Sequence, residues 1–329
     1  MKENDIRPQY LMKENARLRA EDRQIVLKYR ENFVEVPCPA CESDNYQVEF
    51  ERDGFIFVKC NKCETVFINL RPTKELLKTY YATGKAWNHY NEKIFPESEN
   101  ARRSKIIAPR ARMVLDSCKK FAFETRVLVD VGAGFGTFCE EIRKLSVFEK
   151  VIAVEPARGQ AETCRKKGLE VIEKSIEEAQ FEYVSVFTSF ELIEHLFWPK
   201  DFLLACGRAL PKGGLLILTT PNIKGFDLMV LGTISDNIFG PGHLNYFHPE
   251  SLSYLLERCG FEVVEILTPG QLDVDIVRNK ILSGEFDISG FPFLKNILID
   301  QSATLRIAFK KFLAEHKLSS NLWMVARKI

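Results

Sequence analysis

Alternating apolar runs and helical segments after residue 126 constrain the fold of this 329-residue chain more than any other feature. Short apolar runs of this kind are typical of strands that are buried on both faces of a parallel sheet. Helical patterns lie between them, at 136–146, 157–168 and 199–210. This alternation predicts an α/β fold, a doubly wound, mostly parallel seven-stranded sheet with helices on both faces. The strand segments are expected at 126–131, 150–155, 169–172, 183–188, 214–220, 261–267 and 321–329.

A glycine cluster follows the first of these strands, in the stretch VLVDVGAGFGTF. Gly132, Gly134 and Gly136 form G-x-G-x-G, whereas the dinucleotide fingerprint needs glycine or alanine where Thr137 stands. Glycines at such a turn let the backbone pass close to a ligand, beside the start of a helix. Glu155 ends the second strand, where a carboxylate can accept hydrogen bonds from ribose hydroxyls. The pattern indicates a nucleoside-containing ligand, and the glycine spacing alone does not choose its class.

Four of the nine cysteines are grouped near the N-terminus with the spacing C-x2-C-x18-C-x2-C. Two tight turns of this kind direct four thiolates at one point, which is the tetrahedral shell of a structural zinc ion. The stretch between the pairs contains two β-like runs around Asp53-Gly54, a hairpin signal. We therefore predict a zinc ribbon, and a redox C-x-x-C pair is the alternative. The expected zinc ligands are Cys38, Cys41, Cys60 and Cys63.

The domain organisation follows from these signals. We predict an N-terminal helical segment at 1–34, a zinc ribbon at 35–72, a helical linker at 73–120 and a main domain at 121–329 with a helical insertion at about 270–319. Within the linker, the stretch from Arg71 to Phe95 suggests a helix plus a loop. The chain shows no secretion signal and no apolar run of the roughly 20 residues that a membrane span needs, so a cytoplasmic location is expected.

Charge argues against a general attraction to polyanions. The net charge is +1, so the whole chain has no field that would draw it to nucleic acid or to an anionic membrane. Residues 101–120 nevertheless carry seven Lys and Arg against one Asp. This segment is either the solvated face of a helix or a docking surface for a phosphate-bearing substrate.

Five motifs follow one another along 121–269: VDVGAGFGTF, VIAVEPA, TSFELIEHL, LPKGGLLILTTPN and GHLNYFHPESLSYLLERCGF. Together they resemble those of the class I S-adenosylmethionine-dependent methyltransferases that act on small molecules. The N-terminal stretches CPAC, CNKC and FINLRPTKELLKTYY resemble the zinc ribbon fused to methyltransferases of bacterial saccharide and lipopolysaccharide clusters. They are also similar, though less closely, to the zinc-binding front of deoxysugar C-methyltransferases.

This resemblance implies S-adenosylmethionine as the cofactor. The three glycines would cradle its methionine half and ribose, Asp130 would hold that loop, and Glu155 would bind the ribose hydroxyls. Ser175 and Ile176 stand where the family contacts adenine, although Ser175 replaces the family's usual acidic residue. The complete set of expected cofactor residues is Asp130, Gly132, Gly134, Gly136, Glu155, Pro156, Ser175, Ile176, Phe190 and Glu191.

A base that removes a hydroxyl proton from the acceptor would complete the site. His243, His195 and Tyr246 are the candidates, and Asn222, His243 and Tyr246 are candidate substrate contacts. The alternatives are structural, because His195 adjoins acidic residues and Asn222 ends a strand; His248, before a proline, is expected to be structural. Glu194, His195 and His243 match no helical metal motif, so no catalytic metal is expected.

The resemblance thus implies methyl transfer to a small polar acceptor, which we expect to be a nucleotide-linked sugar or glycan in saccharide biosynthesis. One alternative is an RNA methyltransferase that binds RNA through the ribbon, which the charge and the lack of an N-P-P-Y motif disfavour. Another is a non-catalytic assembly module that binds the cofactor. The acceptor atom and the oligomeric state stay open.

Overall fold

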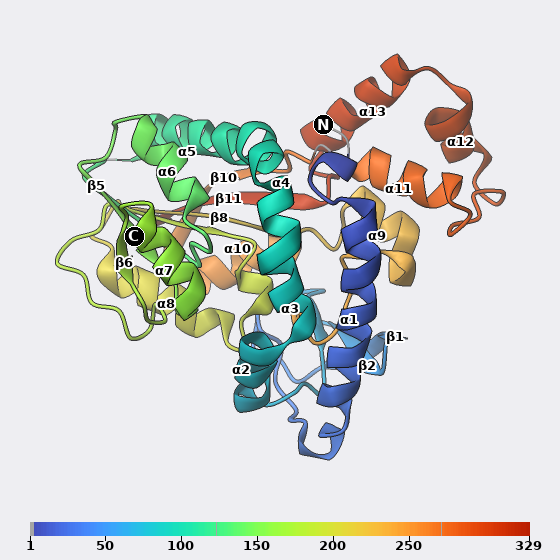
Figure 1. Cartoon of the computed structure of the whole chain (residues 1–329), viewed down its shortest axis with the longest axis horizontal. Helices are drawn as coiled ribbons and strands as arrows, with labels where there is room; N and C mark the ends of the chain where they lie inside the picture. Colours follow the sequence, from blue (N-terminus) through green and yellow to red (C-terminus); the bar gives the residue numbers. More distant parts are fainter. Residues whose placement is uncertain (1–2, 123, 271) are drawn as a thin grey trace.

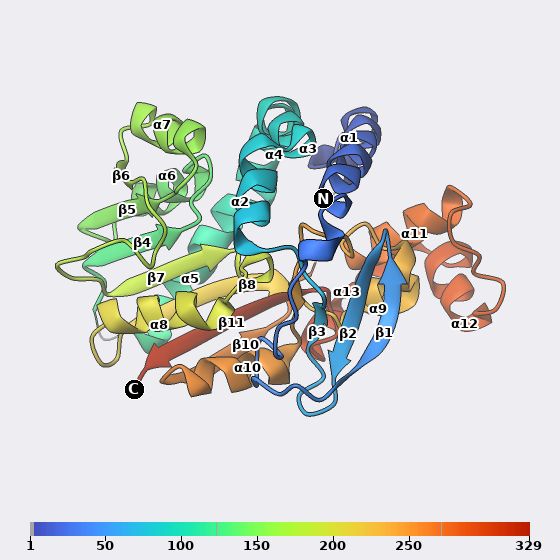
Figure 2. The same cartoon turned by 90° about the horizontal axis from the view of Figure 1, so that it is seen from below.

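A seven-stranded sheet forms the centre of the computed structural model, which describes residues 3–122, 124–270 and 272–329. The strand order is β10-β11-β8-β7-β4-β5-β6, and Figure 2 shows the strands in this sequence. Strands β4 to β8 are parallel, whereas β11 runs antiparallel to β8 and β10. The predicted doubly wound sheet is confirmed. Its strands are β4 (Val127–Val131), β5 (Lys150–Val154), β6 (Glu170–Ile172), β7 (Val186–Phe190), β8 (Leu215–Pro221), β10 (Phe261–Leu267) and β11 (Asn321–Lys328).

Helices cover both faces of this sheet because successive strand residues point to opposite sides. Leu128 packs with the helices on one face, and its neighbour Val129 packs with those on the other. The expected helices within the main domain are all present. On the Leu128 face lie α5 (Ala108–Phe121), α6 (Thr137–Lys144) and α7 (Arg158–Lys166), and on the Val129 face lie α8 (Pro199–Ala209) and α10 (Pro249–Arg258).

The ribbon is a small antiparallel sheet of β1 (Tyr46–Arg52), β2 (Phe55–Cys60) and β3 (Val66–Ile68). Asp53 and Gly54 both have positive φ, 57° and 82°, which is the geometry of the predicted two-residue hairpin turn. A fourth strand, β9 (Asn245–Tyr246), comes from the main domain and pairs with β3. The ribbon therefore shares a sheet with the main domain.

The linker is helical for nearly all of its length, so the loop expected after its first helix is absent from the described residues. Asp22 supplies one reason, because its carboxylate accepts hydrogen bonds from the backbone N–H groups of Lys85 and Ala86 at the start of α3. Because this cap of α3 comes from a residue 63 positions earlier, the sequence around α3 does not reveal it. The helices are α1 (Gln9–Leu27), α2 (Lys74–Thr83), α3 (Lys85–His89) and α4 (Phe95–Arg102), with π-helical turns at Tyr90–Ile94 and Arg103–Ile107 leading into α5.

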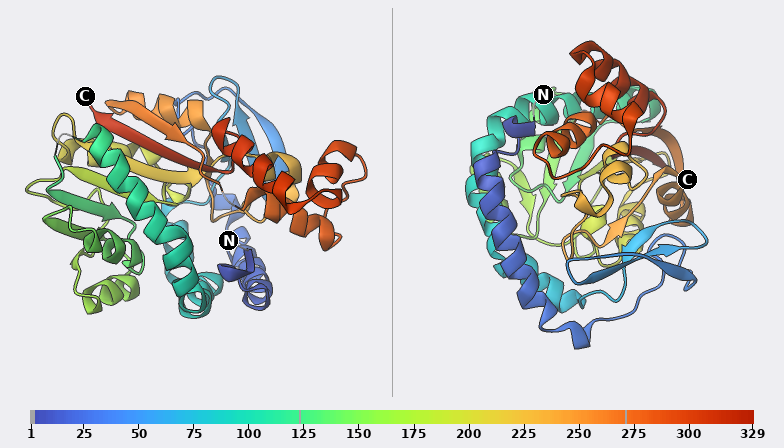
Figure 3. Two further views of the ribbon diagram at one scale, coloured as in Figure 1. Left: turned by 90° about the horizontal axis from the view of Figure 1, so that it is seen from above. Right: turned by 90° about the vertical axis from the view of Figure 1, so that its right-hand side faces the viewer.

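Helix α1 packs beside α3, and together with the linker it forms an arch over one side of the molecule (Figures 1 and 3). The predicted helical insertion is also present and packs on α9 (Phe226–Leu231) around a small apolar core. No helix in the described ranges is long and apolar enough to cross a membrane. The insertion contains α11 (Asp273–Leu282), α12 (Pro292–Lys295), a π-helical turn at Asn296–Asp300 and α13 (Ala303–Glu315); 3-10 helices lie at Glu3–Asp5, Arg30–Asn32, Ile193–His195 and Gly232–Ile234.

Candidate active site at the carboxyl edge of the sheet

The glycine cluster forms a tight loop between β4 and α6. Gly132, Gly134 and Gly136 have φ values of 75°, 54° and 70°, which side-chain-bearing residues rarely adopt. A Cβ atom at Gly136 would lie 2.5 Å from the Leu169 side chain and 2.9 Å from the Cys164 sulfur, so this glycine lets the start of α6 approach α7 and the turn before β6. At Gly134 such an atom would meet no described atom within 4 Å. Gly134 is therefore where the loop is open to an incoming ligand.

Glu155 holds this loop against the end of β5. Its carboxylate accepts a hydrogen bond from the Gly134 N–H at 2.8 Å and another from the Ala157 N–H at 2.9 Å. The residue is only 7% exposed, and burial raises the pKa of its carboxyl. The loop contact expected of Asp130 is thus made by Glu155.

Asp130 lies beneath the loop, inside the sheet. One carboxylate oxygen accepts a hydrogen bond from the Thr188 hydroxyl at 2.8 Å, and the other lies 3.7 Å from the Cys139 sulfur. Burial raises the pKa of Asp130 to about 7. Its hydrogen bond joins β4 to β7 beneath the loop, so we propose that Asp130 fixes the platform on which the glycine loop rests.

The remaining expected cofactor residues occupy the same edge of the sheet. Pro156 is exposed directly after Glu155, and Ser175 starts a turn after β6 with its carbonyl accepting two backbone hydrogen bonds. Ile176 is buried in the core beside them. Because parallel strands bring their carboxyl ends together, these positions are compatible with a ligand that lies over β4, β5 and β6. Their cofactor roles stay predictions.

Phe190 and Glu191 end β7, next to β4. The Phe190 ring packs on Phe138 and lies 4.5 Å from the Arg110 guanidinium carbon. Glu191 has a positive φ of 54°, and its carboxylate accepts hydrogen bonds from Thr219 at 2.6 Å and Asn321 at 2.8 Å. This carboxylate is therefore held in place beside Arg110, 3.9 Å away.

His195 and His243 lie close together although they are distant in the sequence. The backbone carbonyl that contacts the His195 ring belongs to a residue 47 positions later in the chain. The two imidazole rings are 4.7 Å apart, and the Glu194 carboxylate lies beside both. His195 Nδ1 lies 2.7 Å from the Gly242 carbonyl, and His243 Nδ1 lies 2.9 Å from the Asn237 carbonyl. Burial lowers the pKa of both imidazoles, so each is neutral near pH 7. The two candidate bases thus form one cluster.

Tyr246 and Asn222 are placed differently from what a substrate contact requires. Tyr246 is fully buried in β9, and its hydroxyl donates to the Asn237 carbonyl and accepts from the Phe239 N–H, both at 3.1 Å. Asn222 is also fully buried, and its amide group bonds the backbone of Ser319. Because their polar atoms already hold backbone in place, we propose positioning roles for both instead of substrate contact.

The basic segment at 101–120 does not have the free positive charge that docking of a phosphate-bearing substrate needs. Arg103 pairs with Glu99, Glu140 and Glu141, and its nitrogens lie 2.7 to 2.9 Å from their carboxylates. Lys120 pairs with Glu265 at 2.8 Å. These partners neutralise much of the positive charge that a phosphate would need, so the structure gives no support to the docking alternative.

Sequence reasoning missed the part of the N-terminal region that covers the site. The Tyr81 hydroxyl, from α2, donates to the Gly242 carbonyl at 2.8 Å and lies 3.2 Å from His195 Nδ1. Phe95, from α4, stacks on Phe135 of the glycine loop with ring centres 4.2 Å apart. The aromatic composition of the linker was the available signal, but it did not indicate which ring reaches which loop.

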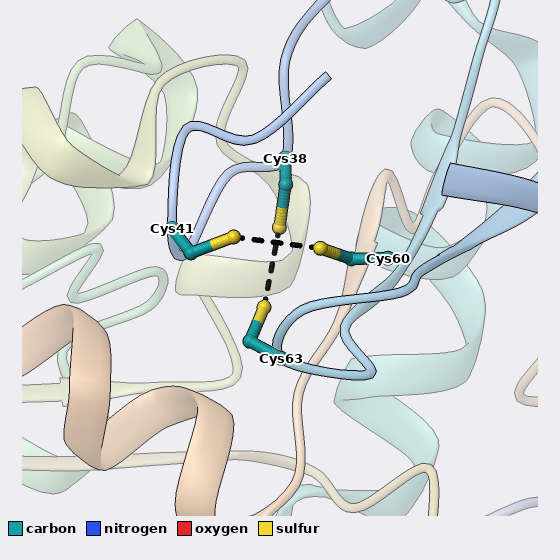
Figure 4. Close-up of side chains that lie close together, drawn as sticks. All are labelled: Cys38, Cys41, Cys60 and Cys63. Carbon is teal, nitrogen blue, oxygen red and sulfur yellow. Dashed lines mark hydrogen bonds between the residues drawn. The ribbon is translucent and has the colours of Figure 1, made fainter. Parts of the chain in front are cut away.

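The four cysteines of the ribbon converge as predicted (Figure 4). The sulfur atoms of Cys38 and Cys63 are 3.4 Å apart, as are those of Cys41 and Cys60. Sulfur atoms around a zinc ion lie about 3.8 Å apart, given bonds of about 2.3 Å in a tetrahedron. The cluster is therefore compatible with a structural zinc ion held by all four thiolates.

The ribbon also supports the histidine cluster. Arg71 is fully buried, and its guanidinium donates hydrogen bonds to the carbonyls of Ile68 and Phe197 and to the Asn245 side chain. His248 Nε2 lies 3.0 Å from the Cys63 carbonyl, which agrees with the structural role predicted for this histidine. Through these bonds and the β3–β9 pairing, the ribbon holds the loop after His195 and the segment that follows His243.

Two curated relatives illustrate how the chain compares with known proteins. It is 32% identical over 122 residues to a ubiquinone biosynthesis O-methyltransferase of Maricaulis maris, covering 33% of this chain and 47% of that protein. A protein of the same name from Bradyrhizobium is 28% identical over 208 residues, or 58% and 75% of the two chains. The chain spans about half the length of the first curated relatives it matches.

A solved structure and a family model also match this chain. The crystal structure of an S-adenosylmethionine-dependent methyltransferase from Archaeoglobus fulgidus matches with a TM-score of 0.48 and 18% identity, covering 72% of this chain and all of that one. The model of the methyltransferase domain family matches residues 99–266, just over half of the chain. That match includes the glycine loop, Glu155 and the histidine cluster. The chain belongs to the methyltransferase domain family.

Proposed function

We propose that this protein transfers a methyl group from S-adenosylmethionine to a hydroxyl oxygen of a small polar acceptor. The observation that carries the proposal is the open glycine loop held by Glu155, together with the buried His195–His243 cluster. The loop follows β4 and the cluster follows β7, and these two strands are neighbours. In open α/β sheets this is where the strand order reverses and where ligands bind.

The residues of the chain fit the cofactor in three respects. Gly134 offers bare backbone to the ligand, Glu155 offers carboxylate oxygens for ribose hydroxyls, and Phe190 and Glu191 are assigned to the methionine end of the cofactor. The cofactor supplies an activated methyl group on a sulfonium, which leaves by in-line displacement. The protein therefore has to orient the acceptor and exclude water, since alignment supplies most of the rate.

The histidine cluster marks the place of the acceptor hydroxyl. Neutral imidazoles accept hydrogen bonds, so His195 and His243 are suited to orient a hydroxyl group. As the new carbon–oxygen bond forms and the carbon–sulfur bond breaks, the hydroxyl proton has to leave. For the metal-free protein we propose that one of these imidazoles accepts it.

We propose a nucleotide-linked sugar or glycan as the acceptor, on the resemblance of the N-terminal ribbon to those of saccharide clusters. A second candidate is an acceptor of ubiquinone biosynthesis, which the names of the Maricaulis and Bradyrhizobium relatives favour. Both classes of acceptor offer hydroxyl groups, so the proposed role of the histidine cluster suits either one.

A release assay for S-adenosylhomocysteine against a panel of acceptors tests the proposal. The panel holds nucleotide sugars, short glycans, hydroxylated precursors of ubiquinone and bulk RNA. Turnover with a sugar supports the first acceptor class, and turnover only with a ubiquinone precursor selects the second. Turnover only with RNA, or cofactor binding without turnover on any member, would contradict the proposal.

Replacing Glu155 by alanine tests the cofactor site directly. The variant loses both hydrogen bonds that hold the glycine loop and the carboxylate assigned to the ribose, so we expect affinity for S-adenosylhomocysteine to fall by about 30-fold or more, or about 2 kcal/mol. Isothermal titration calorimetry measures this change. Glu162→Ala, at a position 48% exposed on α7, is the control and should bind as the wild type does. Unchanged affinity in Glu155→Ala would remove Glu155 from the site.

A further inference from the structure

The Glu194–His195–His243 cluster has the composition of a metal site. One ligand atom from each of the three residues lies within 4.8 Å of the other two. Glu194 and His195 belong to the 3-10 helix after β7, and His243 lies in the loop before β9. Two imidazole nitrogens and one carboxylate oxygen on neighbouring elements form a set that binds divalent transition metals and leaves positions open.

Backbone bonds orient both imidazoles for this task. Each Nδ1 lies within hydrogen-bond distance of a backbone carbonyl, that of Gly242 for His195 and that of Asn237 for His243. A carbonyl only accepts, so each Nδ1 carries the proton and each Nε2 keeps a free lone pair. A hydrogen bond from the ring nitrogen that does not bind the metal is the usual support of a metal-bound histidine, because it sets the tautomer and the ring orientation.

Glu194 supplies an independent observation. Its side chain is 1% exposed, and one carboxylate oxygen accepts a hydrogen bond from Thr220 at 2.9 Å. The other, Oε1, is buried without a hydrogen-bond partner among the described residues, and it lies 3.9 Å from His195 Nε2. An unpartnered carboxylate oxygen in the interior is costly, and a bound cation removes that cost.

We propose that Glu194, His195 and His243 together bind one divalent first-row transition metal ion. Imidazole nitrogen favours ions such as Mn²⁺, Fe²⁺ and Zn²⁺ over Mg²⁺ or Ca²⁺, which prefer oxygen ligands. Ligand atoms at right angles on an ion with bonds of about 2.1 Å lie about 3 Å apart, so the three ligand atoms, now within 4.8 Å of one another, have to approach by up to about 2 Å. The His195 side chain is 18% exposed, which gives the ion a route from solvent.

The position of the metal deepens the proposed function and rests on it. The ion would lie after β7, beside the glycine loop after β4, and its open positions would take the acceptor oxygen. A metal ion raises the acidity of a hydroxyl that it binds, so the proton can pass to solvent water while the two imidazoles serve as ligands. On this proposal the histidines bind the metal and do not act as bases.

Titration of the zinc-loaded protein with Mn²⁺, followed by electron paramagnetic resonance, tests the metal site. Mn²⁺ is chosen because the four thiolates of the ribbon do not compete for it. We expect one Mn²⁺ per chain in the wild type and an affinity lower by about 100-fold or more in His243→Ala and Glu194→Gln. The control is His316→Ala, on the exposed end of α13, which should bind as the wild type does. No binding to the wild type, or equal binding to all variants, would overturn the proposal.

Glu194→Gln also distinguishes a metal-binding role of Glu194 from a purely structural one. Glutamine keeps an acceptor for Thr220 and removes the unpartnered buried carboxylate, so metal-free Glu194→Gln should unfold at the wild-type temperature or above it. A lower unfolding temperature would indicate a structural carboxylate and would count against the site.

The acceptor panel distinguishes failure of this inference from failure of the proposed function. Mn²⁺ binding that the variants lose supports the metal site even if no acceptor is turned over. Turnover that is unchanged in Glu194→Gln and in the presence of a chelator would overturn the metal's role in catalysis, while the proposed methyl transfer would stand.

Discussion

Replacing Cys60 by serine is expected to abolish zinc binding at the ribbon and to lower the unfolding temperature by about 10 °C or more. Cys60 is fully buried at the end of β2, and its sulfur faces those of the other three cysteines (Figure 4). Structural zinc supplies about 10–16 kcal/mol of binding free energy in small zinc domains, so a lost thiolate removes much of what folds the ribbon. Zinc content and thermal unfolding measure both effects.

The same variant should impair the acceptor side of the active site and leave the cofactor side intact. Strand β9 pairs with β3 of the ribbon, so an unfolded ribbon leaves the loop that carries His243 without its support. The glycine loop is held by Glu155 within the main domain. We therefore expect methyl transfer to be lost while the affinity for S-adenosylhomocysteine changes by less than about threefold, or about 0.7 kcal/mol.

Cys118→Ser is the matched control for this experiment. Cys118 is also buried, at 2% exposure, but it lies on α5 in the other apolar core, which contains none of the four ribbon cysteines. This variant should keep its ribbon zinc and lose only the stability that a buried hydroxyl costs, about 1–3 kcal/mol. A Cys60→Ser protein that retains the ribbon zinc and the wild-type unfolding temperature would contradict the zinc assignment.

Replacing Arg71 by alanine is expected to lower the free energy of unfolding by about 3–5 kcal/mol. The guanidinium is fully buried, and burial lowers its pKa to about 9, so the charge is retained at neutral pH. It donates hydrogen bonds of 3.1 to 3.2 Å to three acceptors, in the ribbon, in the loop after His195 and in β9. The substitution leaves these buried acceptors without a donor and creates a cavity.

Urea unfolding of Arg71→Ala, Arg71→Lys and a surface control measures this effect. Lysine keeps the charge but not the planar fork of donors, so Arg71→Lys should lose an intermediate amount of stability. Arg158→Ala removes a side chain that is 83% exposed and should stay within about 0.5 kcal/mol of the wild type. An Arg71→Ala protein as stable as Arg158→Ala would show that this arginine does not join the ribbon to the main domain.

Local patterns in the sequence were sufficient for the fold. The strands around Leu128 and Ile217 are continuous apolar runs, and such runs form buried parallel strands wherever helices can cover them. The turn at Asp53-Gly54 and the two C-x-x-C pairs are equally local, because each is specified by residues a few positions apart. Gly132, Gly134 and Gly136 belong to the same class of signal.

The sequence by itself therefore determined the sheet, the cysteine cluster and the glycine loop, whereas only the tertiary structure decided the acceptor side of the site. Glu194 and His243 meet because β9 pairs with β3 and because Arg71 bonds loops far apart in the chain. Tyr246 and Asn222 were equally plausible from sequence, yet their polar atoms bond distant backbone. Such contacts depend on how separate elements dock. The short-range periodicity that predicts strands and helices contains no information about that docking.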